Sequence, residues 1–152
     1  MSTRFEQFTA AIASIHKCIL KIERMELSKY GLKAPHTQCL LAMHRHPDGI
    51  TAARLCDICE KDKAAISRTI AELEQAGMVQ RDDPNGKRYR SNLKLTETGM
   101  QVANSVQALA HKAVNEATGG YGEEQREVFT STLAMIASNL ESICRDGLHA
   151  TE

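Results

Sequence analysis

Apolar residues recur along most of the chain at alternating steps of three and four positions, a spacing that places them on one face of a helix. Near the N-terminus this seam contains Phe8, Ile12, Ile15, Ile19 and Ile22. It predicts a helix from about residue 5 to about residue 29 that ends at Tyr30-Gly31. A similar seam near the C-terminus contains Phe129, Leu133, Ile136, Leu140 and Ile143. It predicts a last helix that ends near Gly147.

Three shorter helices are predicted in the middle of the chain. The first begins at Pro35, a residue favoured in the first turn of a helix, and stops before His46-Pro47-Asp48-Gly49. Thr51 can cap the second, and a tight connection at Glu60-Lys61-Asp62 leads into the third. The apolar side of the third helix contains Ile66, Ile70 and Leu73. Two short helices joined by a few residues form the helix-turn-helix pattern.

The period of the apolar residues changes after Gly77. Residues 78–82 and 89–95 are predicted to form two short strands around a turn that contains Asn85-Gly86, a strong hairpin signal. Thr96 can cap a further helix, which is broken by Gly119-Gly120-Tyr121-Gly122. The predicted order is therefore four helices, a β-hairpin and two helices.

This order predicts a mainly α fold with a small β-hairpin wing, in a single chain that spans residues 1–152. Residues 34–96 are predicted to form a winged helix-turn-helix region, an arrangement that commonly binds DNA. The seamed helices, in residues 4–30 and 97–147, need apolar partners, and we expect them to pack together and against a second copy as a twofold homodimer. The alternative is that they complete the core of one monomer.

Composition and charge argue against an exported, membrane or disulfide-rich protein, but they do not by themselves indicate a function. The chain has 19 basic and 19 acidic residues, so a nucleic-acid partner must be argued from where the charges lie. The residues up to Phe8 show no signal peptide, and no run of about 18 apolar residues occurs, so we expect a cytoplasmic protein without membrane contact. Five cysteines without an export signal indicate reduced thiols rather than a disulfide framework.

The helix over residues 62–76 has the position of a recognition helix, whose N-terminal residues meet base edges in the major groove of double-stranded DNA. The predicted DNA-binding residues on it are Lys63, Ala64, Ser67, Arg68 and Thr69. Small side chains let the helix lie deep in the groove. Arg68 can pair with O6 and N7 of a guanine, a contact worth about 1–3 kcal/mol of base discrimination.

The hairpin offers a second basic cluster, formed by Lys87, Arg88 and Arg90 beside the Asn-Gly turn. A basic hairpin tip can lie along a phosphate backbone or enter a minor groove. Asp82 and Asp83 are candidates to hold these arginines in position. A solvated charged turn is the alternative, but the neighbouring recognition helix favours DNA contact.

Two motifs make the sequence resemble the multiple-antibiotic-resistance regulator (MarR) family. They are Leu73-Glu74-x-x-Gly77-Met78-Val79-x-Arg81 and Leu95-Thr96-x-x-Gly99. The resemblance implies a homodimer, joined by its first and last helices, that binds a pseudo-palindromic operator and most often represses transcription. The sequence differs from the family at the wing, where Lys87 and Tyr89 occupy the positions of the family's Asp-x-Arg pattern. We therefore assign the DNA contacts of the wing's basic side chains to Arg88 and Arg90.

The resemblance also implies an effector that alters DNA affinity, of which a small apolar or phenolic compound is the main candidate. Its pocket would lie between the terminal helices and the winged-helix region. The predicted lining residues are Ile15, Ile19, Ile22, Met25, Leu40 and Met43. The alternative is that these apolar residues belong to the hydrophobic core and line no pocket.

Other chemistries remain as alternatives. Cys56 and Cys59 have a metal-ligand spacing, but a structural zinc site needs about four ligands and no second pair is present, so we expect no metal and no cofactor. Cys18, beside a lysine, is the nearest candidate for an oxidant-sensing thiol. No spacing of Ser, His and Cys indicates an enzyme. A winged helix that binds another protein instead of DNA is the remaining alternative.

Overall fold

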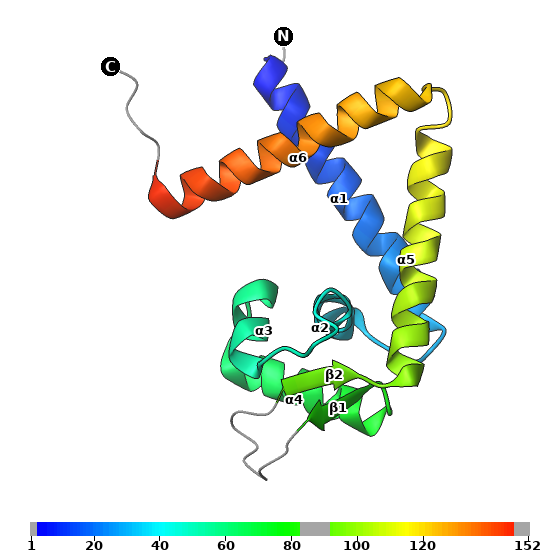
Figure 1. Cartoon of the computed structure of the whole chain (residues 1–152), viewed down its shortest axis with the longest axis vertical. Helices are drawn as coiled ribbons and strands as arrows, with labels where there is room; N and C mark the ends of the chain where they lie inside the picture. Colours follow the sequence, from blue (N-terminus) through cyan, green and yellow to red (C-terminus); the bar gives the residue numbers. More distant parts are fainter. Residues whose placement is uncertain (1–2, 83–91, 148–152) are drawn as a thin grey trace. The chain divides into compact units, whose positions relative to one another are not determined.

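In a computed structural model that describes residues 3–82 and 92–147, the chain has the predicted order of elements (Figure 1). These are α1 (Arg4–Ser28), α2 (Ala34–His44), α3 (Ala52–Cys59), α4 (Lys63–Gln75), β1 (Val79–Asp82), β2 (Asn92–Leu95), α5 (Glu97–Ala117) and α6 (Glu123–Asp146). The backbone forms two compact units, one that ends at Lys112 and one that begins at Ala113. The mainly α fold with a β-hairpin is thereby confirmed.

Side-chain caps explain where α3 and α5 begin. Thr51 accepts a hydrogen bond from the backbone N–H of Arg54 (3.2 Å) and so starts α3, as predicted. Thr96 does the same for α5, because its hydroxyl oxygen accepts from the N–H of Gly99 (3.0 Å). Each cap satisfies a backbone donor that has no partner inside its helix.

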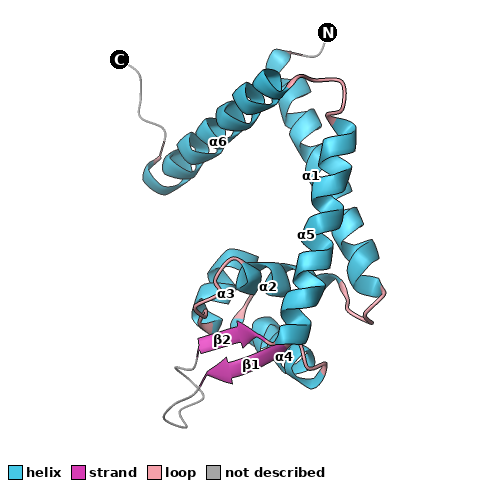
Figure 2. Cartoon of the chain, turned by 45° about the vertical axis from the view of Figure 1, so that its right-hand side comes forward, coloured by secondary structure: helices cyan, strands magenta, loops and turns pink. Residues whose placement is uncertain are grey.

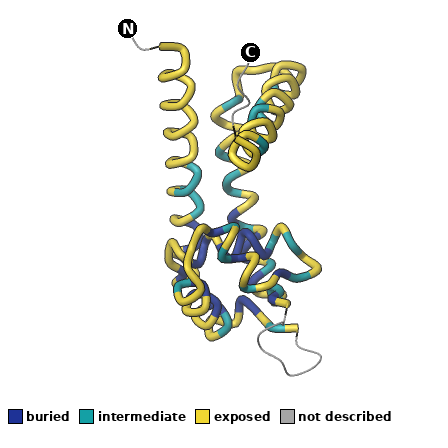
Figure 3. The backbone as a smooth tube through the Cα atoms, turned by 90° about the vertical axis from the view of Figure 1, so that its left-hand side faces the viewer, coloured by how far each residue is buried: buried dark blue, intermediate teal, exposed yellow. Residues whose placement is uncertain are grey.

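The core of the first unit lies between α2, α3, α4, the hairpin and the start of α5. Its fully buried side chains include Leu40, Leu55, Ile66, Ile70, Leu73, Leu93 and Val106. Figure 3 shows the buried backbone positions gathered in this part of the chain. Burying a side chain of this size contributes about 1.5–3 kcal/mol, so this cluster is the main source of the unit's stability.

The two strands, magenta in Figure 2, form one antiparallel sheet in the described part of the chain. Their register pairs Val79 with Leu95 and Arg81 with Leu93. Leu93 also exchanges two backbone hydrogen bonds with Ile50, of 2.8 and 3.0 Å, so the segment before α3 is fixed to the hairpin. The predicted turn at residues 83–87 and the predicted strand residues 89–91 lie outside the described residues.

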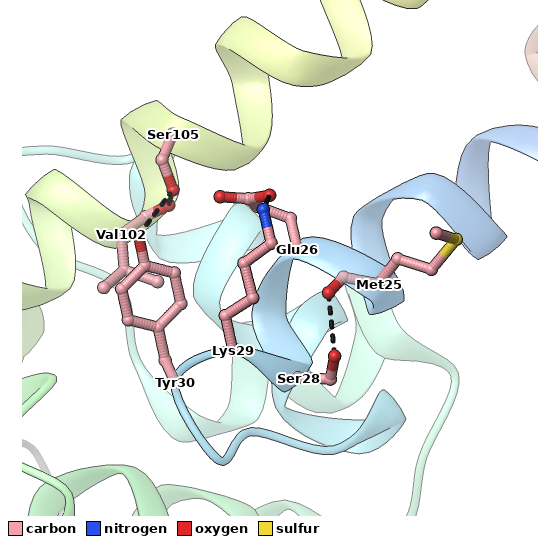
Figure 4. Close-up of polar contacts among 7 residues, drawn as sticks. All are labelled: Met25, Glu26, Ser28, Lys29, Tyr30, Val102 and Ser105. Carbon is pink, nitrogen blue, oxygen red and sulfur yellow. Dashed lines mark hydrogen bonds and ion pairs between the residues drawn. The ribbon is translucent and has the colours of Figure 1, made fainter.

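A polar corner joins the end of α1 to α5 within the first unit (Figure 4). Ser105 donates to the carbonyl of Val102 (2.8 Å), and its hydroxyl oxygen lies 3.3 Å from the hydroxyl of Tyr30. Lys29 forms an ion pair with Glu26 beside this contact. The C-terminal end of α1 is therefore fixed to α5.

Most of α1 and all of α6 lie at the surface of the single chain. Within α1 only Glu26 and Leu27 are buried, and none of the residues of α6 is. The exposed apolar residues of these helices include Phe5, Phe8, Ile12, Ile15, Val128, Phe129, Met135, Leu140 and Ile143. None of the described helices is long and apolar enough to span a bilayer.

Candidate nucleic-acid interface

A three-residue turn sets the angle between α3 and α4. Glu60 adopts a left-handed backbone conformation (φ +50°), and the N–H of Lys61 donates to the carbonyl of Cys56 (3.1 Å), which closes α3. Asp62 then caps α4 by accepting from the N–H of Ala65 (2.8 Å). The connection is short and is hydrogen-bonded at both helix ends, which fixes the direction of α4 relative to α3.

Helix α4 has one buried and one exposed side. Ile66, Ile70 and Leu73 are each no more than 1% exposed, because their spacing of four and three places them on the face towards the core. The exposed residues of the predicted stripe are Lys63, Ala64, Ser67 and Arg68. Small and hydrogen-bonding side chains thus occupy the outer face of the first two turns, as a recognition helix requires.

Thr69 differs from the other residues predicted on this helix. Its side chain is buried, and its hydroxyl donates to the carbonyl of Ala65 one turn earlier (3.0 Å). A threonine hydroxyl can satisfy itself in this way inside a helix. The structure therefore places Thr69 on the packed side of α4 and gives its hydroxyl a partner within the helix.

Two polar contacts hold α4 against its neighbours. His36 of α2 lies 2.6 Å from the carboxylate of Glu72, and its other ring nitrogen accepts from the backbone N–H of Lys33 (2.9 Å). Because Nδ1 is the acceptor, Nε2 carries the proton that is donated to Glu72. At the other end of α4, Arg81 of β1 donates to both carboxylate oxygens of Glu74 (2.7 and 3.4 Å). Helix α4 is thus fixed to α2 and to the hairpin.

The wing residues of the prediction, Lys87, Arg88 and Arg90, lie outside the described residues, as does Asp83. Asp82 was a candidate partner for the wing arginines. In the structure its carboxylate accepts from Lys94 of the paired strand (3.0 Å). This cross-strand pair fixes the described end of the hairpin.

A surface pocket of about 310 Å³ lies between α2, α3 and α4, beside the outer face of the recognition helix. Arg68 and Glu72 line it from α4, and Lys61 lines it from the turn. Lys61 was not among the predicted DNA-binding residues, because the sequence showed it only as part of a tight turn. Its exposed ammonium group lies next to the N-terminus of α4, where a phosphate would also be favoured by the helix dipole.

The six residues predicted to line an effector pocket do not share one cavity in the described structure. Leu40 and Met43 are fully buried in the core, whereas Ile15 and Met25 are exposed on α1. Ile19 and Ile22 are half-buried. A pocket of about 450 Å³ along α1 includes Met25, but its other lining residues are Lys17, Lys21, Arg24 and Ser28. The predicted effector pocket therefore stays a prediction.

Thiols and metal-binding groups were the other candidates. Cys18 is exposed on α1, Cys56 is half-buried and Cys59 is buried. In the part of the chain that the structure describes, no three His, Cys, Asp or Glu side chains are placed to hold one metal ion.

Comparison with known proteins agrees with this geometry. Residues 30–88 match the sequence model of the MarR family. The fold is similar to that of a MarR transcriptional regulator from Methanosarcina mazei Go1, with a TM-score of 0.76 and 22% identity, over 91% of this chain and 99% of that one. For a crystal structure of MarR the TM-score is 0.77 and the identity 22%, over 96% and 99% of the two chains.

A further similar structure is that of a putative MarR family transcriptional regulator from Listeria monocytogenes, solved in complex with a 26mer DNA. Its TM-score is 0.72 and its identity 19%, over 99% of this chain and 100% of that one. Residues 30–88 are therefore similar to the MarR family in sequence, and the chain has the fold of these MarR transcriptional regulators.

Proposed function

We propose that the protein is a homodimeric transcription regulator that binds a pseudo-palindromic operator in double-stranded DNA. The observation that carries this proposal is the outer face of α4, where Lys63, Ser67 and Arg68 are exposed on a helix whose other side is buried. Arg68 would contact a base edge, and Lys61 and Lys63 would contact phosphates. The DNA complex of the Listeria monocytogenes protein with the same fold supports this assignment.

The wing is assigned a supporting role on the sequence alone. Lys87, Arg88 and Arg90 would contact phosphates or the minor groove next to the site of α4. Contacts of this kind strengthen binding to every DNA sequence and are weakened by salt.

The exposed apolar seams of α1 and α6 support the homodimer. Phe129 is 53% exposed and Ile15 is 50% exposed in the single chain, although both lie on seams with helical spacing. Helices of this length gain most of their stability from packing an apolar face, so a seam left in water would be costly. A second copy presents the same seams and covers them without another partner.

A twofold dimer would place its two α4 helices in successive major grooves, about 34 Å apart. Bound there, it would repress transcription by occupying promoter DNA. A small apolar or phenolic effector that changes the separation of the two helices would lower the affinity, because the two half-sites are at a fixed distance.

The proposal is tested by selecting DNA from a random pool and measuring the affinity of the selected sequence by fluorescence anisotropy at several salt concentrations. We expect a palindrome with half-sites about 10 base pairs apart. Arg68→Ala should weaken binding to this sequence, whereas Arg145→Ala, which removes the same charge from α6, should leave the affinity within about twofold.

Two results would overturn the proposal. One is that no sequence is enriched by the reduced protein. The other is that Arg68→Ala and Arg145→Ala have equal effects, since α4 would then not be the surface that meets DNA. Absence of both enrichment and salt-dependent binding would favour a winged helix that binds another protein.

A further inference from the structure

Two cysteines from different helices lie in contact beneath the recognition helix. The sulfur atoms of Cys39, on α2, and Cys59, the last residue of α3, are 3.8 Å apart. Both residues are almost fully buried, with exposed fractions of 1% and 5%. They are 20 positions apart in the chain, and no sequence pattern pairs Cys39 with Cys59 rather than Cys56 with Cys59.

The two thiols are not equivalent. The hydrogen bond from Cys39 lowers the pKa of the Cys59 thiol, and the nearby Lys61 ammonium lowers it further, against the opposing effect of burial. The same contact with Cys59, together with burial, raises the pKa of the Cys39 thiol well above its ordinary value. Cys59 is therefore the thiol of the pair that loses its proton more readily, and Cys39 is the one that donates to it.

A small molecule can reach the pair from the surface. Cys39 and Cys59 both line the pocket of about 310 Å³ between α2, α3 and α4. Lys61 and Arg68 line the same pocket with positive charge and Glu72 with negative charge, and the Lys61 ammonium is close enough to act on the Cys59 thiol. A hydroperoxide is small enough for such a pocket, and its reduction leaves a negatively charged oxygen that these cations would stabilise.

We propose that Cys39 and Cys59 form a reversible disulfide when a hydroperoxide enters this pocket, and that the disulfide lowers the affinity of α4 for DNA. The first part concerns the chemistry of the pair alone. The second part rests on the proposed function.

The oxidation proceeds in two balanced steps. The Cys59 thiolate attacks one peroxide oxygen, so that an S–O bond forms, the O–O bond breaks, and the departing oxygen takes a proton from solvent to leave as water or an alcohol. The Cys39 sulfur then attacks the resulting sulfenic sulfur. The S–S bond forms, the S–O bond breaks, and the hydroxide leaves with the Cys39 proton as water. Two thiols lose two electrons, and one hydroperoxide gains them.

Disulfide formation requires the sulfurs of Cys39 on α2 and Cys59 on α3 to come closer together. Bonded sulfurs lie about 2.05 Å apart, so these two must approach each other by about 1.8 Å from their present 3.8 Å. The core around them is close-packed and does not absorb such a shift without moving its neighbours. The residue after Cys59 is Glu60, in the left-handed conformation that begins the turn into α4. A shift of Cys59 would act on the turn that sets the direction of α4.

The test treats the purified protein with hydrogen peroxide, digests it with trypsin and identifies linked peptides by mass spectrometry. Cys39 lies in the peptide 34–45, whereas Cys56 and Cys59 share the peptide 55–61. Cys56→Ala and Cys59→Ala are therefore matched variants of the same peptide. The affinity of each protein for the selected DNA is measured before oxidation, after oxidation and after addition of dithiothreitol.

We expect the linked peptide pair in the wild type and in Cys56→Ala but not in Cys59→Ala. Oxidation should weaken DNA binding at least tenfold in the first two proteins, dithiothreitol should restore it, and Cys59→Ala should keep its affinity within twofold. Circular dichroism checks that Cys59→Ala is folded. If it is not, Cys39→Ala replaces it with the same expected results, and the peptide map of the wild type remains decisive for the link.

The inference is overturned if peroxide oxidises the exposed Cys18 completely while Cys39 and Cys59 stay unlinked, or if the link forms and affinity does not change. These results are distinct from a failure of the proposed function. If the proposed function is wrong, the reduced protein itself selects no DNA sequence, although the linked peptides could still be found.

Discussion

At the scale of single residues, the carboxylate of Asp62 decides where α4 begins. It accepts a hydrogen bond from the N–H of Ala65, 2.8 Å away. We predict that Asp62→Ala lowers the free energy of unfolding by about 1 kcal/mol, because a backbone donor at the helix start loses its partner. Asp62→Asn should preserve stability to within about 0.5 kcal/mol, since asparagine caps equally well. Urea denaturation of the two variants checks this, and equal losses would contradict it.

In contrast to Asp62, Glu23 on α1 has a carboxylate whose charged form lowers the free energy of unfolding. Burial raises its pKa above the ordinary value, although Arg45 and His16 act to lower it. With a higher pKa in the folded state, the folded chain binds the proton more tightly, so stability falls as pH rises from the unfolded pKa through the folded one.

Removing this charge is therefore predicted to stabilise the protein. Glu23→Gln should raise the unfolding free energy at pH 7, and the gain should disappear below the ordinary pKa of a glutamate, where the wild-type side chain is protonated in both states. Glu124→Gln, at an exposed position of α6, is the control. A gain from Glu23→Gln that stays constant down to pH 3 would show that the charge is not its cause.

Residue-scale patterns in the sequence predicted which side of α4 is exposed, but they did not predict which side chains pair with one another. The four-and-three spacing of Ile66, Ile70 and Leu73 fixes which side of α4 is outside, so Arg68 could be placed. The same spacing does not decide a borderline position, and Thr69 proved to be buried. The contact between Cys39 and Cys59 depends on how α2 packs on α3, which no local pattern contains.

At the scale of elements, the junction between the hairpin and α5 connects the end of α4, the hairpin and the start of α5. Thr96 donates to the carbonyl of Gly77 at the end of α4 (2.6 Å) while it caps α5. Three residues later, a Cβ on Gly99 would lie 2.0 Å from the carbonyl oxygen of Met78. In the Leu-Thr-x-x-Gly motif, the start of α5 therefore packs closely against the backbone before β1. Its glycine is required because a larger residue would clash with the carbonyl of Met78.

We predict that Gly99→Ala destabilises the protein by about 3 kcal/mol, the upper range for inserting one carbon into a packed site. The carbonyl of Met78 belongs to the backbone and cannot rotate away. Gly120→Ala, where a Cβ would meet nothing within 4 Å, should change stability by less than about 0.5 kcal/mol. Thermal and urea unfolding compare the two, and similar midpoints would refute the steric reading.

The elements themselves were largely predictable, because their ends carry capping residues and glycines. The contacts that hold these elements to one another were not predictable. The bridge between Ile50 and Leu93 joins the segment before α3 to β2, but one residue on each side leaves no periodic signal. The Glu74–Arg81 pair is visible as part of a motif, yet only the structure shows that it fixes the recognition helix to β1.

At the scale of the whole molecule, the seams of α1 and α6 predict dimerisation. Ile12 is 40% exposed and Leu140 is 50% exposed in the single chain. Ile12→Asp and Leu140→Asp should each shift the protein from dimer towards monomer in sedimentation velocity, because a charge would be buried without a partner. Ser138→Asp is the matched control, since it lies about 180° around α6 from the centre of the seam. An unchanged sedimentation coefficient in both seam variants would contradict the dimer.

Base recognition by Arg68 of α4 is tested by combining one residue change with one base change. The affinities of wild type and Arg68→Ala are measured for the selected operator and for operators in which each base pair is replaced symmetrically. We predict that one replacement costs the wild type about 1–3 kcal/mol per half-site and costs Arg68→Ala almost nothing. If every base replacement costs both proteins equally, Arg68 reads no base and its proposed base contact is wrong.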